Sequence, residues 1–166
     1  MKKNALYIHG FMGNPEGGTF KTLQKTLKNW NIYSILFPDL HIDVEKTQRL
    51  ISAYCKSKKI DMLIGASLGA FYVLQYKDTI DKLVINPCLY PSIEIPKLRD
   101  RTTGNTIILS NKVLSDFRGM EKYDEFLKHK SPEPSVFLQK TMNYFISKIH
   151  LINCFTTKNV IIQTAF

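Results

Sequence analysis

The most informative stretch of this sequence is Leu63-Ile64-Gly65-Ala66-Ser67-Leu68-Gly69, a short apolar run that breaks into Gly-x-Ser-x-Gly and continues as the apolar segment 70–74. This layout is typical of a nucleophile elbow, in which a strand turns sharply into a helix and presents a serine at the turn. Gly65 and Gly69 lack the Cβ atoms that would clash where strand and helix cross. Ser67 is therefore expected in a strained backbone that leaves its Oγ exposed. The alternative interpretation is a glycine-rich turn with an idle serine.

A second informative segment lies near the N-terminus. Residues 4–8 are expected to form a buried strand, which runs directly into His9-Gly10-Phe11. A loop at this place commonly supplies one backbone N–H of an oxyanion hole, and the residue after the nucleophile supplies the other. The predicted donors are therefore the N–H groups of Phe11 and Leu68, with Gly10 allowing the chain to approach closely. His9 is expected to brace the turn by hydrogen bonding, and its alternative role is that of a general base.

With both loops in view, the chain resembles the α/β-hydrolase superfamily, and within it the small bacterial YqiA-like esterases. The residues that carry the resemblance are 6–11, Phe37-Pro38-Asp39-Leu40, 64–72 and Leu83-Val84-Ile85-Asn86-Pro87, so that it covers about residues 3–137. The resemblance implies an α/β fold with a doubly wound, mostly parallel sheet. It also implies serine-dependent hydrolysis of a small-molecule ester or thioester without a cofactor, but it does not identify the acyl group or the alcohol.

Length and composition indicate a single globular domain. The chain has 166 residues, of which 44% are hydrophobic and 22% charged, which is typical of a folded domain with its own core. No run approaches the ~18 apolar residues of a membrane span, so we expect no membrane partner. The three cysteines, Cys55, Cys88 and Cys154, are widely spaced and lack a Cys-x-x-Cys pairing. A reduced cytoplasm is therefore the expected setting, and a zinc site is not expected.

The formal net charge of +9 raises the possibility of a nucleic-acid partner. The basic residues are scattered, however, with local clusters only at 56–59 and 128–130. Both clusters fall where a helix is expected to end, and lysines are favoured there by the helix dipole. No recognition-helix or aromatic RNA-binding motif accompanies them. Solvated helix ends are thus the preferred interpretation, and no nucleic-acid partner is expected.

The order of the expected elements supports the fold. They are strand 4–8, helix 19–29, strand 32–37, a helix capped by Asp43, strand 62–66, helix 68–76, strand 82–86 and a helix at about 111–129. Alternation of strands and helices with short connections predicts a parallel sheet, with the site at the carboxyl ends of its strands. The core is predicted to span residues 1–137, and an insertion at about 88–134 is predicted to form a small lid over Ser67.

The rest of a catalytic triad is harder to find. In this fold the acid and then the histidine follow the serine along the chain, each after a late strand. Residues 135–137 resemble the start of such a strand, yet none of the 14 acidic residues lies beyond Glu133. His150 is the nominal candidate for the base. Asp116, Asp124 and Glu133 are the candidates for the acid, although Asp116 and Asp124 are better explained as a solvated helix face.

Residues 138–166 form an atypical tail that suggests a frameshift or truncation. We therefore expect the last strands of the sheet to be lacking or altered, with Leu83, Ile85 and Val136 incompletely buried and self-association through an open strand edge. Two functional hypotheses remain: a serine hydrolase, or an inactive hydrolase scaffold. A metal at His41 with its flanking acids is a weaker possibility, because a helix-entry loop explains those acids and further ligands are not visible.

Overall fold

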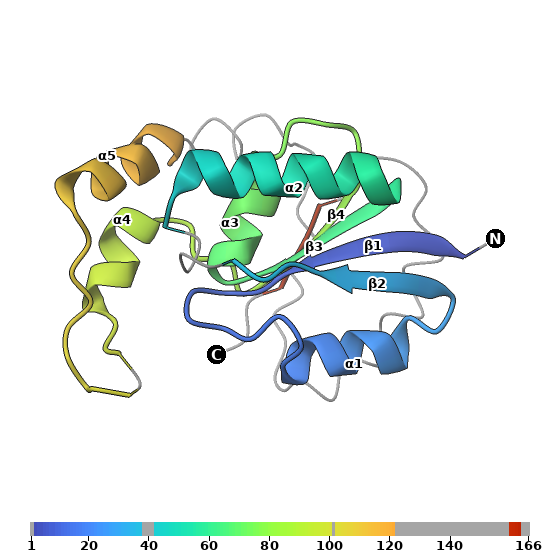
Figure 1. Ribbon diagram of the computed structural model, residues 1–166, viewed down its shortest axis with the longest axis horizontal. Coiled ribbons are helices and arrows are strands. Elements are labelled where there is room, and N and C mark those ends of the chain that lie inside the picture. Colours follow the sequence, from blue (N-terminus) through green and yellow to red (C-terminus); the bar gives the residue numbers. More distant parts are fainter. Residues whose placement is uncertain (1, 38–41, 101, 122–159, 164–166) are drawn as a thin grey trace.

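A five-stranded parallel sheet forms the centre of the structure (Figure 1), a computed structural model that describes residues 2–37, 42–100, 102–121 and 160–163. Within these residues the strand order is β2-β1-β3-β4-β5. The strands are β1 (Lys3–Ile8), β2 (Trp30–Ser34), β3 (Met62–Ala66), β4 (Asp81–Ile85) and β5 (Val160–Gln163). All the pairings are parallel, so the carboxyl ends of the strands meet at one edge of the sheet.

Helices cover both faces of this sheet. Helix α1 (Gly18–Thr26) lies on one face, and α2 (Val44–Lys58) and α3 (Leu68–Gln75) lie on the other. Successive strand residues alternate between the two sides, as period-two geometry requires. The α2–α3 core includes Leu6, Ile8, Leu63, Val84, Ile51, Phe71, Tyr72 and Phe117, and the α1 core includes Ala5, Tyr7, Ile64, Leu83, Phe20 and Leu23. The predicted doubly wound parallel sheet is therefore confirmed.

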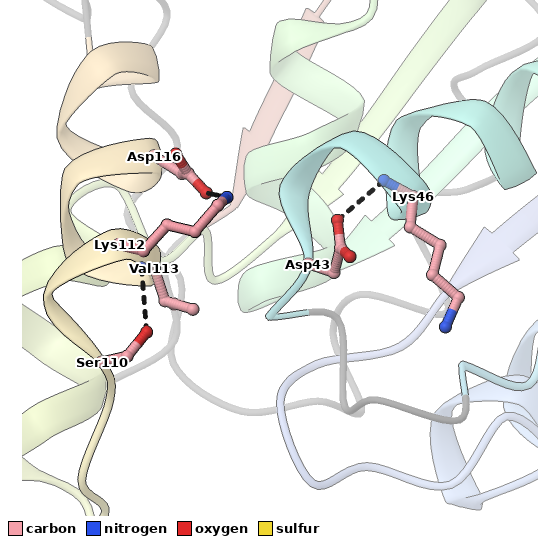
Figure 2. A network of polar contacts seen from close by, with 6 residues as sticks. All are labelled: Asp43, Lys46, Ser110, Lys112, Val113 and Asp116. Carbon is pink, nitrogen blue, oxygen red and sulfur yellow. Dashed lines mark hydrogen bonds and ion pairs between the residues drawn. The ribbon is translucent and has the colours of Figure 1, made fainter.

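The helix starts follow the capping residues. The side chain of Asp43 accepts a hydrogen bond from the Lys46 N–H at 3.0 Å, and Ser110 caps Val113 in the same way (Figure 2). Each side chain satisfies an amide that has no partner within its helix. The predicted cap at Asp43 is thus confirmed.

Two element bounds differ from expectation near the first helix. Helix α1 ends at Thr26 rather than at residue 29, with Leu27 as its C-cap. Strand β2 begins at Trp30 rather than at residue 32, and Trp30 pairs with Lys3. The Lys3 ammonium lies over the Trp30 ring, 5.5 Å from its centroid. Pairing with β1 thus sets the start of β2.

The segment after β4 forms a small helical insertion. It contains α4 (Pro91–Glu94), the 3-10 helix η1 (Ile95–Lys97) and α5 (Asn111–Met120). Helices α4 and α5 lie side by side at the end of the sheet where the strands finish (Figure 1). The helix predicted at about 111–129 starts as expected, but it ends at Met120, because the backbone of its C-cap, Glu121, leaves the helical region with a ψ of 59°. The remainder of the predicted lid, 122–134, lies outside the described residues.

The sheet continues beyond β4, because β5 pairs with it in register, Leu83 opposite Ile161. Leu83 is 2% exposed and belongs to the α1 core, so the expectation that it would be incompletely buried is wrong. Ile85 is half-buried, as expected. Val136 and the late strand predicted at 135–137 lie outside the described residues, as does most of the atypical tail 138–166.

None of the helices in the described part of the chain combines the length and the hydropathy needed to cross a membrane.

Candidate active site

Ser67 occupies the turn between β3 and α3. Its φ of 50° and ψ of −118° lie in a region that non-glycine residues rarely adopt. Hydrogen bonds hold both sides of this residue: its N–H donates to the Ile85 carbonyl at 3.0 Å, and its C=O accepts from the Ala70 N–H at 3.0 Å. The residue is exposed, and its side chain caps no helix amide. The backbone is therefore fixed and strained while the hydroxyl stays accessible.

The two elbow glycines lie where strand and helix cross. A Cβ on Gly65 would lie 2.5 Å from the Ala70 Cα, and one on Gly69 would lie 2.1 Å from the Ile8 carbonyl oxygen. Both contacts are with backbone atoms, which cannot rotate away. Glycine is thus required at both positions to bring β3, α3 and the end of β1 together.

The loop after β1 lies directly against Ser67. A Cβ on Gly10 would come within 2.9 Å of the Ser67 Cβ and 3.4 Å of its Oγ. The next residue, Phe11, is half-buried and packs against the α2–α3 core. Leu68 is the first residue of α3, so its N–H has no carbonyl four residues back within the helix. Both proposed amide donors thus belong to segments adjoining the serine.

His9 is fixed inside the loop. It is 3% exposed, and its Nδ1 lies 2.8 Å from the Gly10 carbonyl oxygen. Because a carbonyl only accepts, Nδ1 carries the proton of this bond. The imidazole also meets the Phe37 ring edge-on, with centroids 5.8 Å apart. Burial lowers the pKa of His9, so this side chain braces the loop as a neutral group.

The burial of His9 makes the stability of the folded protein depend on pH. Because the pKa of His9 is lowered in the folded state, the unfolded chain binds more protons once the pH falls below about 6.5, the ordinary histidine value. The contribution of neutral His9 is present above that value and is lost as the pH falls. We expect the melting temperature to drop between pH 7.5 and 5.5, and to drop less steeply in His9→Gln. Parallel profiles for the two proteins would show that His9 is not the titrating group.

Three of the remaining triad candidates, His150, Asp124 and Glu133, lie outside the described residues, as does His41, the candidate for a metal site. Asp116 lies on α5, where its carboxylate pairs with the exposed Lys112 ammonium at 2.6 Å (Figure 2). It therefore forms part of a solvated helix face, in line with the sequence interpretation. The base and acid of a triad stay predictions.

Two residues beside the elbow, Asn86 and Cys88, were given no role in the site by the sequence, although Asn86 ends a strand expected to finish there. Asn86 follows β4 with a positive φ of 44°, and the Cys88 N–H donates to the Ser67 carbonyl at 3.1 Å. Asparagine tolerates positive φ better than most residues, so Asn86 carried a weak signal. The contact of Cys88 uses only its backbone, and its side-chain type therefore gave no signal.

Comparison with known proteins places these features in context. The model of an uncharacterised protein family, UPF0227, matches residues 4–161. The sequence matches none of the curated proteins with which it was compared. Among solved structures, the chain is similar to the esterase domain of a Rhodothermus marinus protein, with 20% identity, a TM-score of 0.44, and coverage of 71% of this chain and 57% of that one. It is also similar to a proposed hydrolase of the alpha/beta superfamily from Xanthomonas campestris pv. campestris, with 15% identity, a TM-score of 0.43, and coverage of 78% and 100%.

Proposed function

We propose that this chain, which belongs to the uncharacterised protein family UPF0227, is a serine hydrolase acting on carboxylic esters or thioesters. The observation that carries the proposal is the exposed Ser67, held at a φ of 50° between β3 and α3. A residue in such a conformation is strained, and strained residues concentrate at functional sites. The close approach of Gly10 to its Cβ and Oγ adds a second loop to the same place.

The chemistry would follow from this arrangement. The Ser67 Oγ attacks the carbonyl carbon of the ester, and the Phe11 and Leu68 amides donate to the oxyanion that forms. Collapse of this intermediate expels the alcohol or thiol, which takes up the proton that the serine loses. Water then hydrolyses the acyl-enzyme and restores the hydroxyl. Transfer of these protons needs a base, for which His150 is the candidate.

An activity-based fluorophosphonate probe tests the nucleophile without knowledge of the substrate. Attack by Ser67 would form an Oγ–P bond and release fluoride, and we expect mass spectrometry to find the label on Ser67 alone. Ser67→Ala should abolish labelling. Ser57→Ala should not, because Ser57 is an exposed serine at the end of α2 whose hydroxyl donates to the Tyr54 carbonyl. Label on another serine, with Ser67→Ala unaffected, would sink the assignment.

The second candidate is an inactive hydrolase scaffold with a binding role. It is favoured by the sequence after Glu133, which contains no acidic residue. It is also favoured by His9, the only histidine in the described part of the chain, since it is 3% exposed and braces its own loop through Nδ1. In this case the serine and the amide donors persist without a base.

Turnover of p-nitrophenyl acetate separates the two candidates. Without a base, an oxyanion hole and binding alone leave about 10³–10⁴-fold catalysis over water. The inactive scaffold predicts hydrolysis by the purified chain at no more than this weak level, unchanged in both Ser67→Ala and His150→Ala. Robust turnover that both substitutions abolish would exclude the inactive scaffold and establish His150 as the base.

The proposed setting is the cytoplasm. Cys55 and Cys88 are both buried free thiols, and buried unpaired cysteines are typical of proteins from reducing compartments. Burial raises the pKa of the Cys55 thiol, which keeps it protonated and unreactive. These cysteines are therefore better explained as core residues than as part of the site.

A further inference from the structure

One peptide group connects the nucleophile to its proposed oxyanion donor. The Ser67 C=O and the Leu68 N–H belong to the same planar, trans unit, so they point in opposite directions. A contact that fixes the direction of the Ser67 C=O therefore also fixes the direction of the Leu68 N–H. The carbonyl accepts from the Ala70 and Phe71 amides of its own helix, and from the Cys88 N–H of a different segment at 3.1 Å.

The segment that carries Cys88 leads directly into α4, and α4 is held by a carboxylate. Glu121 accepts one hydrogen bond from the Ser92 N–H and a second from the Ser92 Oγ, both at 2.8 Å. Ser92 is 5% exposed, in the first turn of α4. A charged acceptor that holds both donors of one buried residue makes a strong and directional contact.

Glu121 is in turn fixed to the elbow helix through α5. Its N–H donates to the Phe117 carbonyl at 3.1 Å, and the Phe117 ring meets that of Phe71 on α3 edge-on, with centroids 5.8 Å apart. The Gln75 amide, also on α3, donates to the Met120 carbonyl at 2.8 Å. The contacts thus close a ring that runs from α3 through α5 and α4 back to the elbow.

We propose that Glu121 is a positioning residue, which holds α4 and the Cys88 segment so that the Ser67–Leu68 peptide keeps its amide aimed at the oxyanion. The inference rests on the proposed function for its catalytic meaning. Burial, with the carboxylates of Glu94 and Glu121, raises the pKa of the Cys88 thiol, which supports the closeness of Glu121 to this segment. Glu121 itself takes no part in bond making.

The first test measures the rate at which the fluorophosphonate probe labels Ser67, well below the melting temperature of each variant. Loss of an oxyanion donor costs about 10²–10³-fold in rate, and misaiming it should cost part of this. We expect Glu121→Ala to slow labelling about tenfold, and Ser92→Ala, which keeps the N–H contact, to slow it less. The matched control is Lys112→Ala, which removes an exposed 2.6 Å ion pair with Asp116 on the same helix but outside the ring.

The second test is amide hydrogen exchange, which does not need activity. Exchange of the Cys88 amide should accelerate in Glu121→Ala and stay at the wild-type rate in Lys112→Ala. Unchanged Cys88 exchange in Glu121→Ala, or equal slowing of labelling by Glu121→Ala and Lys112→Ala, would overturn the inference. Absence of label on wild-type Ser67 would instead contradict the proposed function, and exchange alone would then decide whether Glu121 holds the elbow.

Discussion

Gly69→Val should destabilise the protein by about 3 kcal/mol or more, through overpacking and backbone strain. The Cβ alone would lie 2.1 Å from the Ile8 carbonyl oxygen and 2.6 Å from that of His9. Real Cβ atoms do not approach so closely, so α3 and the end of β1 must move apart. Leu68 begins α3, and Phe11 lies in the loop that follows β1. The same movement should therefore also separate these two proposed amide donors. Urea unfolding followed by circular dichroism measures the loss.

The chain supplies a matched control at Gly119 on α5. A Cβ there meets nothing within 4 Å, and alanine is the better helix former by up to about 1 kcal/mol. Gly119→Ala should therefore leave stability unchanged or raise it slightly. An unaltered melting temperature in Gly69→Val would show that Gly69 does not lie at a strand–helix crossing.

The sequence predicts the parts of the site that depend on local rules. The spacing of Gly65, Ser67 and Gly69 specifies a turn whose geometry only those residue types allow, and the structure has this turn between β3 and α3. The buried strand before His9 leads to the same edge, because parallel strands end together. The alternation of strands and helices was thus sufficient to predict a parallel sheet, and the resemblance to a known family implied that it is doubly wound.

Contacts between distant segments could not be predicted in the same way. The Glu121 carboxylate binds Ser92, 29 residues earlier in the chain. Similarly, the strand that pairs with β4 opposite Leu83 begins only at Val160. No local propensity encodes such pairings. The base and acid of a triad are equally hard to predict, since they come from loops far from the serine in the sequence.

Phe117→Ala should cost about 3–5 kcal/mol, the usual loss for a buried phenylalanine, because it leaves a cavity as well as removing apolar contact. Phe117 is fully buried in the α2–α3 core, and its ring packs edge-on against that of Phe71. Urea unfolding again provides the measurement. Ile108→Ala is the control from the same insertion, since Ile108 is 90% exposed and its loss should change stability by no more than about 0.5 kcal/mol.

The result bears on how the proposed lid could work. If Phe117→Ala is as costly as expected, α5 is part of the core, and lifting it from α3 would expose the same ring at a comparable cost. Within the described residues, an opening over Ser67 would then have to come from the connection between η1 and α5, where Leu98 and Ile108 are exposed and one bridge joins Arg99 to Thr106. A near-neutral Phe117→Ala would contradict this, and would leave α5 itself free to act as the moving part.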